Sequence, residues 1–312
     1  MSKRVAIIDL GTNTFNLLVA EIKSSHSYTI QYERKLPVRL GEGGINQGII
    51  TEAAQIRALD ALSTHLGVAE ELGASQIKAF GTSAIRSAKN KTKFLERINT
   101  ELNLKIEVID GNREAELIYE GITLSVPMDQ TPVLILDIGG GSNEFIIATG
   151  ENLLWKKSYP LGMARILQKF SFSDPYTAKE TEELKAYFNG ELGGLSEAMA
   201  LHRVRTLIGA SGSFETFAAM LRSMKPSVYS SNSATYSVIS LDDYKLLHNR
   251  LITSTLQERL KMEGLEPMRA DMIVPASIFV TFILDKFSIP GIIQSDFSLK
   301  EGVLHELIKK FA

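Results

Sequence analysis

Cysteine is absent from the 312-residue sequence, which excludes disulfide bonds and thiolate ligands for a metal. A strong excess of charge is also absent, because 34 Lys and Arg stand against 36 Asp and Glu, a formal net charge of −2. The surface as a whole therefore attracts neither nucleic acid nor acidic lipid, and any bound anion must be held by local groups. The lack of cysteine fits a reducing cytoplasm, where we expect the protein to reside.

Long apolar runs are missing as well. The run that starts at Val5 stops at Asp9, too early for a signal peptide, and residues 272–284 contain Pro275 and are too short to span a bilayer. We therefore expect no membrane partner and a buried helix at 272–284. Five histidines are scattered without metal-ligand spacing: His26, His65, His202, His248 and His305. A chain of this length, 44% hydrophobic, is sufficient for two domains.

A strand–turn–strand pattern occurs twice. Val133–Ala148 reads as an apolar strand, a turn with three consecutive glycines and a second apolar strand. Glycines without Cβ atoms let backbone N–H groups approach an anion closely. Val5–Ala20 aligns with this segment without a gap at an offset of 128 residues, which places Asp9 on Asp137, Gly11 on Gly139 and Asn16 on Glu144. Two matched hairpins predict two matched halves, each presenting a loop to a ligand.

Three strand–turn–helix junctions add further candidate groups. Ile77–Phe80 leads into a Gly-Thr-Ser turn and Arg86, which is either a solvated arginine on a capped helix or a guanidinium that grips phosphate. Ile106–Ile109 leads into a helix with Glu114 and Glu116 near its start. These carboxylates either compensate the helix dipole or supply a general base. Residues 205–208 lead into Gly209–Ser213, a third candidate anion turn.

Together these features favour a phosphate-handling enzyme. Oriented N–H groups, an arginine and carboxylates able to hold Mg²⁺ are what phosphoryl transfer requires. The glycine-rich loop that begins at Arg39 is either a surface loop or a substrate contact, and the sequence favours neither interpretation.

The motifs resemble those of the actin, Hsp70 and sugar-kinase superfamily and, more narrowly, of the exopolyphosphatase and guanosine pentaphosphate phosphohydrolase (Ppx/GppA) family. They are IDLGTNTFNLLVA, GTSAIRSA, IEVIDGNREAELIYEGI, LDIGGGSNEF, GASGS, RADMIVPA and LKEGVL, in family order. The resemblance implies an α/β fold of two ribonuclease-H-like (actin-like ATPase) domains flanking a central cleft. It also implies Mg²⁺-dependent, or Mn²⁺-dependent, release of a terminal phosphate from inorganic polyphosphate or pppGpp.

By position, the resemblance places the catalytic glutamate on Glu114 and the phosphate-binding arginine on Arg86. It places the acidic residues on the metal side on Asp137 and Glu144, and the duplicated hairpin adds Asp9. The expected phosphate-binding residues belong to three turns: Thr12, Asn13 and Thr14; Gly139, Gly140, Gly141 and Ser142; and Gly209, Ser211, Gly212 and Ser213.

The sequence departs from the family pattern at several positions. Arg113 replaces the first residue of a common Glu pair, and its charge is expected to lower the pKa of Glu114. Asn143 stands where a Thr is common, and Thr12 and Thr14 replace serines, which keeps hydrogen-bonding capacity. Longer members add a C-terminal helical domain that this chain is too short to hold, so processive action on very long polymers is not expected.

The expected domain division is discontinuous. Residues 1–124 and 298–312 would form the first domain and residues 125–297 the second, with Ser125–Pro132 as the linker and Leu299–Phe311 as a helix that returns to the first domain. Thr177–Met199 is predicted as one long amphipathic helix.

Two alternatives remain open at this stage: an ATP-dependent kinase or ATPase of the same superfamily, and an alarmone-binding sensor without turnover. Polyphosphate or guanosine penta- or tetraphosphate is the expected partner, and nucleic acid is not. A homodimer is left open.

Overall fold

The computed structural model describes residues 3–25, 27–229 and 235–310. His26 and Phe311, both named in the predictions above, lie outside the described residues. The contacts divide the chain into two compact units: unit 1 comprises residues 1–124 and 298–312, and unit 2 comprises residues 125–297. The chain therefore passes between the units twice, after residue 124 and before residue 298.

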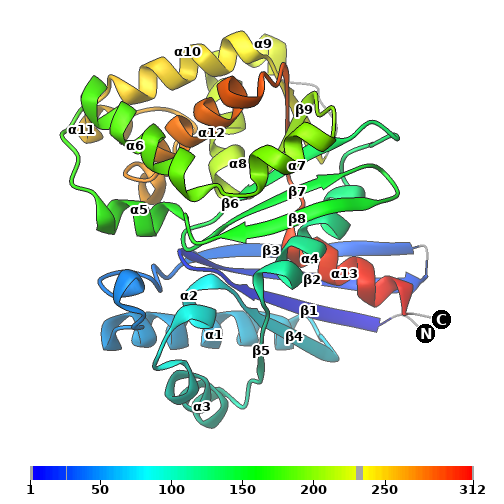
Figure 1. The fold of residues 1–312 in the computed structure, drawn as a ribbon. Helices are drawn as coiled ribbons and strands as arrows, with labels where there is room; N and C mark the ends of the chain where they lie inside the picture. Colours follow the sequence, from blue (N-terminus) through cyan, green and yellow to red (C-terminus); the bar gives the residue numbers. More distant parts are fainter. Residues whose placement is uncertain (1–2, 26, 230–234, 311–312) are drawn as a thin grey trace. The chain divides into compact units, whose positions relative to one another are not determined.

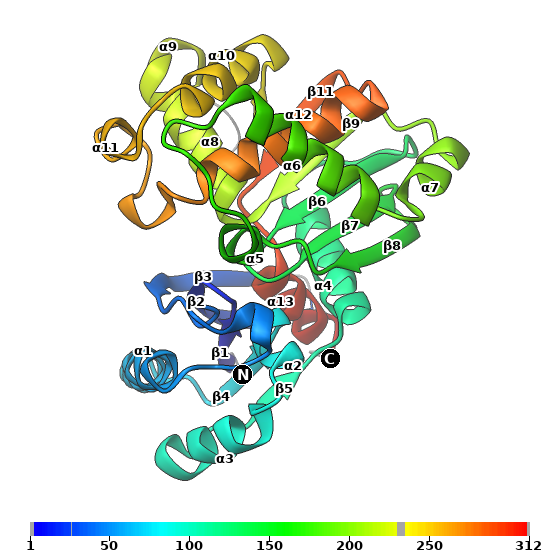
Figure 2. The same cartoon turned by 60° about the vertical axis from the view of Figure 1, so that its left-hand side comes forward.

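Unit 1 is a five-stranded sheet with helices on both faces (Figures 1 and 2). The strand order is β3-β2-β1-β4-β5, in which β1 is antiparallel to β2 and parallel to β4. Its elements are β1 Lys3–Leu10, β2 Thr14–Ser24, β3 Ser27–Pro37, the 3-10 turn η1 Ile45–Gln47, α1 Glu52–Glu71, β4 Gln76–Gly81, α2 Ser83–Ser87, α3 Lys91–Leu102, β5 Ile106–Val108, α4 Gly111–Thr123 and α13 Leu299–Lys309.

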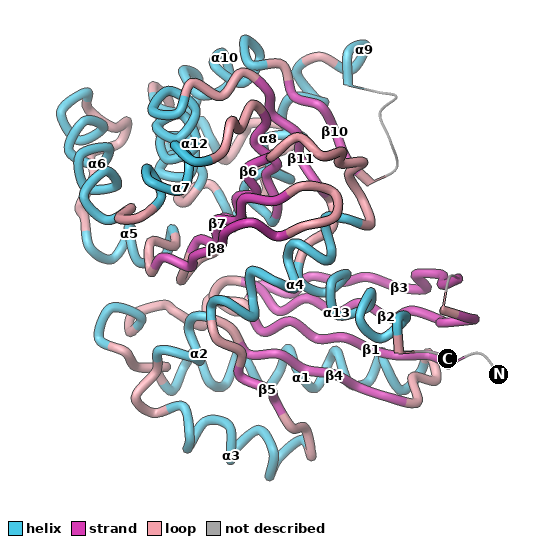
Figure 3. Tube along the Cα trace, turned by 45° about the vertical axis from the view of Figure 1, so that its right-hand side comes forward, coloured by secondary structure: helices cyan, strands magenta, loops and turns pink. Residues whose placement is uncertain are grey.

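Alternation along β1 assigns each face of this sheet to different helices. Ala6, Ile8 and Leu10 share a core with the buried face of α1. The alternate residues face the other side, where α13 contacts β1 and β2 and packs along α4 (Figure 3). Gly121 and Gly302 allow this close helix pairing, since a Cβ on Gly302 would lie 1.8 Å from the carbonyl oxygen of Leu117. The C-terminal helix is thus an integral part of unit 1.

Unit 2 is a six-stranded sheet of order β10-β11-β9-β6-β7-β8. Apart from β10, this order repeats that of unit 1, with β6 antiparallel to β7 and parallel to β9. The elements are β6 Val133–Ile138, β7 Asn143–Ala148, β8 Leu153–Tyr159, α5 Met163–Lys169, α6 Ala178–Glu191, α7 Leu195–Leu201, β9 Thr206–Ala210, α8 Ser211–Met224, α9 Pro226–Tyr229, β10 Tyr236–Ile239, α10 Leu241–Ile252, α11 Leu256–Arg259, the 3-10 turn η2 Pro267–Arg269, α12 Ile273–Phe287 and β11 Gly291–Ser295.

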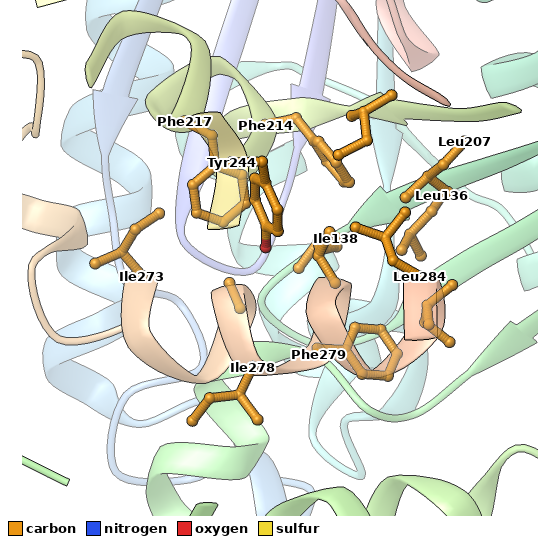
Figure 4. Packing of buried hydrophobic residues seen from close by; sticks show 14 of the residues in the cluster. Leu136, Ile138, Leu207, Phe214, Phe217, Tyr244, Ile273, Ile278, Phe279 and Leu284 are labelled. Carbon is orange, nitrogen blue, oxygen red and sulfur yellow. The ribbon is translucent and has the colours of Figure 1, made fainter. Parts of the chain in front are cut away.

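The core of unit 2 forms where α8, α10 and α12 pack against the sheet (Figure 4). Phe217 and Tyr244 meet edge to face with ring centroids 5.4 Å apart, and the Tyr244 hydroxyl donates to the carbonyl of Ser277 at 3.0 Å. The apolar segment predicted as a buried helix is α12, which has ten buried residues.

The prediction of a single helix over Thr177–Met199 is wrong. The segment forms α6 and α7, which are separated at residues 192–194. Gly194, the residue before α7, has a φ of +85°, a left-handed conformation that glycine adopts easily and that a continuous right-handed helix does not contain. The two adjacent glycines therefore interrupt the helix despite the amphipathic pattern on either side.

Candidate active site

The first candidate site lies at the carboxyl ends of β4 and β5 in unit 1. Arg86, from α2, donates through Nη1 to Glu114 Oε2 at 2.7 Å and to the carbonyl of Ile109 at 3.0 Å. The Glu114 side chain is 10% exposed and that of Arg86 is 24% exposed, so the ion pair is largely buried. The structure thus brings together the two residues that the sequence assigned to catalysis.

Local sequence explains why Glu114 is held here. The Asp110 side chain accepts the Arg113 backbone N–H at 2.8 Å and caps α4, which places Glu114 in its first turn. The Ile109 backbone N–H donates to the Gly81 carbonyl at 3.1 Å and joins the end of β5 to the end of β4. The ends of neighbouring parallel strands are the usual position of a ligand site in an open α/β sheet.

Arg113 does not pair with Glu114 as its neighbouring position suggested. Its guanidinium binds Glu306 at 2.6 Å and Glu116 at 3.4 Å, and hydrogen bonding to Glu306 raises the pKa of Arg113. The cation that contacts Glu114 is Arg86.

The turn of the first hairpin is fixed by backbone bonds. The Gly11 N–H donates to the Thr14 carbonyl at 3.1 Å, and a Cβ on Gly11 would lie 2.8 Å from the same oxygen. The loop that follows β3 binds this turn, because Val38 and Arg39 donate backbone N–H groups to the Asn13 carbonyl, both at 2.9 Å. The Thr12–Thr14 turn is therefore held on both sides.

The second hairpin has the same geometry. The Gly139 N–H donates to the Ser142 carbonyl at 3.1 Å, as in the first hairpin. Helix α5 begins directly on this turn: Met163 and Ala164 donate backbone N–H groups to the carbonyls of Gly139 and Gly140. A Cβ on Gly162 would lie 2.2 Å from the Gly140 carbonyl carbon, so a larger residue there would displace the glycine turn.

Two buried carboxylates lie opposite each other in this hairpin. Asp137 and Glu144 are partners in the antiparallel register of β6 and β7 and are 6% and 2% exposed. Opposed residues of an antiparallel pair share one face of the sheet. In the first hairpin the corresponding partners are Asp9 and Asn16, whose amide donates to Asp9 Oδ2 at 2.9 Å. Unit 2 therefore offers two carboxylates where unit 1 offers one.

The third candidate turn is joined to the second hairpin. Ser211 begins α8 in a left-handed conformation, with a φ of +65°, and its hydroxyl donates to Asp137 Oδ2 at 2.6 Å. A non-glycine residue with this φ carries backbone strain that its surroundings must compensate. In the parallel register of β6 and β9, Ala210 lies beside Asp137. The Gly139–Ser142 and Gly209–Ser213 turns thus lie side by side at the carboxyl ends of β6 and β9.

Sequence reasoning missed three side chains that contact these turns or Glu144. Ser158 donates to Glu144 Oε1 at 2.7 Å, and Arg165 donates through Nε to the Gly141 carbonyl at 2.7 Å. The Arg269 guanidinium packs against Gly212, where a Cβ would lie 1.9 Å from its Nη2. Arg269 is the first residue of the RADMIVPA motif, and Arg165 lies in the first turn of α5, the helix that follows Pro160. Their positions in the sequence could have indicated a role for both arginines.

A hard divalent cation fits the donor set of the second hairpin. No group of three or more His, Cys, Asp or Glu that could hold a metal exists among the described residues. Asp137 and Glu144 nevertheless supply two oxygen-donor side chains on one sheet face. Mg²⁺ retains several waters and binds substrate phosphates, so one or two protein carboxylates are sufficient for it. Zinc, which prefers nitrogen and sulfur ligands, is not suited to this set.

The shared strand order and the two matched glycine hairpins define an actin-like fold of two ribonuclease-H-like domains, and the fold class predicted from the sequence is confirmed. The sequence matches the Ppx/GppA phosphatase family over residues 18–311, and the chain belongs to that family, as the motifs predicted. An exopolyphosphatase from Cytophaga hutchinsonii has a structure similar to this chain, with a TM-score of 0.94 and 39% identity over 99% of each chain.

Two curated relatives add to this comparison. Exopolyphosphatase 2 of Mycobacterium tuberculosis is 28% identical over 89% of this chain and 88% of its own length. A bifunctional 3-dehydroquinate synthase/phosphatase of Fusobacterium nucleatum is 30% identical over 93% of this chain, which spans only 44% of that longer protein. None of the helices in the described residues has the length and apolar character needed to cross a membrane.

Proposed function

We propose that this chain is a phosphohydrolase that releases the terminal phosphate from inorganic polyphosphate by attack of water. The observation that carries the proposal is the buried Arg86–Glu114 pair at the carboxyl ends of β4 and β5. Membership of the Ppx/GppA phosphatase family supports the reaction class, and the names of the Cytophaga and Mycobacterium relatives support polyphosphate as substrate. pppGpp is the second substrate to be tested, because the family includes both activities.

In this proposal Glu114 orients the attacking water and accepts its proton. A carboxylate in the first turn of a helix is firmly placed, and its ion pair with Arg86 keeps one oxygen fixed. Arg86 has a second role, because a guanidinium can pair with a carboxylate and a phosphate oxygen at once. Arg86 would therefore hold the terminal phosphate next to the base.

The turns of unit 2 would bind phosphate oxygens through backbone N–H groups, with Arg269 packed behind Gly212. Asp137 and Glu144 would hold Mg²⁺ or Mn²⁺, with Ser211 and Ser158 orienting the two carboxylates. The metal, when bound, neutralises charge on the phosphate chain. Asp9 and the Thr12–Thr14 turn are the corresponding groups of unit 1.

Parallel assays of phosphate release from polyphosphate, pppGpp and ATP test the proposal, with Mg²⁺ present and without an added acceptor. In water enriched in ¹⁸O, each released phosphate should carry one ¹⁸O atom, because the attacking oxygen comes from solvent. Release that depends on an added alcohol would instead indicate a kinase. Tight binding of guanosine tetraphosphate with no phosphate release from any substrate would indicate an alarmone sensor.

A further inference from the structure

A pocket of about 400 Å³ lies on the sheet of unit 1, on the face that α13 partly covers. Its wall includes residues from β1, β2, β4, β5 and α4, and it is completed by α13 and by Lys310, which follows that helix. The sheet residues share one face, because Lys3 is the register partner of Ile22, and Phe80 is the partner of Glu107. The pocket is thus enclosed by one face of this sheet together with residues of α4 and α13.

Positive charge predominates at the rim of this pocket. Lys3, Lys78, Lys310 and Arg113 line it, against Glu107 and Glu306. Arg113 is paired with Glu306, whereas Lys3, Lys78 and Lys310 have no ion pair among the residues that the structure describes. Like charges that converge on one concave surface repel each other unless an anion is bound between them. In a protein with a net charge of −2, this local excess requires a specific explanation.

The floor of the pocket is apolar. Val5, Ile22, Phe80 and Val303 are buried at the base, and Leu307 from α13 forms one side. An apolar base with a few polar groups around it is the usual design of a small-molecule site, and 400 Å³ lies within the size range of such sites. The half-buried Leu307 is the apolar side chain of this lining that a ligand with an aromatic ring would cover, whereas an inorganic phosphate chain would leave it exposed.

We propose that this pocket is a second anion site, which binds a nucleoside polyphosphate. The base would lie against Leu307 above the buried floor, and the phosphates would be bound by Lys3, Lys78 and Lys310. Glu107 would accept hydrogen bonds from the ribose or base. No residue of this site belongs to the Arg86–Glu114 pair or to the phosphate turns, so the inference goes beyond the proposed function.

The site has one direct connection to the candidate catalytic base. Arg113 lines the pocket and precedes Glu114 in the first turn of α4. The Arg113 guanidinium lies 2.6 Å from the Glu306 carboxylate. A phosphate in the pocket would compete with Glu306 for this guanidinium. A bound nucleotide would therefore alter the contacts that fix the start of α4.

Protection of lysines from acylation, read by mass spectrometry on the full chain, tests the site directly. ADP is the probe, inorganic tripolyphosphate and adenosine are the comparison ligands, and Lys93, an exposed lysine on α3, is the internal control. We expect ADP to slow the acylation of Lys78 and Lys310 at least about tenfold while Lys93 reacts at its original rate. Arg86→Ala should retain this protection, which separates the site from the catalytic pair and from the proposed hydrolysis.

Charge reversal provides the second arm. Lys78→Glu should weaken ADP binding in calorimetry by about tenfold or more, and Lys93→Glu should leave it unchanged. Equal protection by tripolyphosphate and ADP would contradict the claim that the pocket selects a ligand with an aromatic base. Absence of protection at saturating ADP, or ADP binding unaffected by Lys78→Glu, would overturn the anion site itself.

Discussion

The guanidinium of Arg86 lies 2.7 Å from the carboxylate of Glu114, and 27 residues separate them in the chain. Two elements that follow neighbouring parallel strands, α2 after β4 and α4 after β5, bring them together. The ion pair holds one oxygen of Glu114 in place, so the position of the candidate base depends on Arg86. The pair also makes the two residues interdependent, which governs the first prediction.

Arg86→Ala should lower kcat and shift the acid limb of the pH–rate profile to higher pH. Without its cation the buried carboxylate of Glu114 favours the protonated form, which cannot accept a proton. Arg86→Lys should show a smaller shift but a raised KM, because an ammonium cannot bind carboxylate and phosphate in the same planar fork. Unchanged kinetics and an unchanged pH profile in Arg86→Ala would place this arginine outside the reaction.

Divalent cation dependence follows from the second hairpin. Asp137→Asn and Glu144→Gln should each raise the Mg²⁺ concentration needed for half-maximal activity, because each removes a charged oxygen ligand. Mn²⁺ should replace Mg²⁺, and Zn²⁺ should not restore activity after chelation. Titration of activity against free metal concentration measures the effect. Full turnover in excess EDTA would contradict the assignment of these carboxylates.

Ser211 combines two roles that substitutions can separate. Ser211→Ala keeps the left-handed backbone and loses the bond to Asp137, so it should destabilise the protein by about 1–2 kcal/mol. It should also raise the Mg²⁺ concentration needed for half-maximal activity. Ser211→Gly loses the same bond but relieves the strain, so its stability should recover while its metal response does not. Denaturant unfolding and metal titration of both variants check this. Equal metal affinity in all three proteins would show that the Ser211–Asp137 bond has no role in metal binding.

Unit 2 should lose stability on acidification through His248. Burial lowers the pKa of His248 from 6.5 to about 4, with the charge of Lys185 as a smaller cause. The folded protein therefore resists a proton that the unfolded chain takes up, so stability is full above pH 6.5 and falls as the pH drops toward 4. We expect a loss of roughly 2–3 kcal/mol over this interval. Thermal unfolding of His248→Gln should show a smaller pH-dependent loss than wild type or His202→Gln. Equal loss in all three would remove His248 as the cause.

Several elements could be predicted from sequence because their determinants are local. The gapless offset of 128 residues anticipated that both hairpins would share one register, and Asp9 opposite Asn16 matches Asp137 opposite Glu144. The break between α6 and α7 was missed because the helical periodicity outweighed Gly193 and Gly194 in the interpretation.

The contacts of the candidate site were less predictable because they join distant segments. Arg113 was placed beside Glu114 by sequence adjacency, but neighbouring residues in a helix point about 100° apart. Arg113 instead binds Glu306 of α13, which sequence spacing alone could not indicate. Arg269 reaches Gly212 from a segment more than fifty residues away, so its position depends on how η2 packs against α8.

The rate of phosphate release by Glu114→Gln tests the central claim most directly. The substitution keeps the shape of the side chain and removes its charge, so substrate binding should persist while kcat falls by about 10²–10⁴-fold, the usual cost of losing a general base. Glu116→Gln is the matched control, since Glu116 lies on the same helix, is 41% exposed and pairs with Arg113. The account predicts near wild-type turnover for Glu116→Gln and almost none for Glu114→Gln. The reverse result, or wild-type turnover in both, would contradict it.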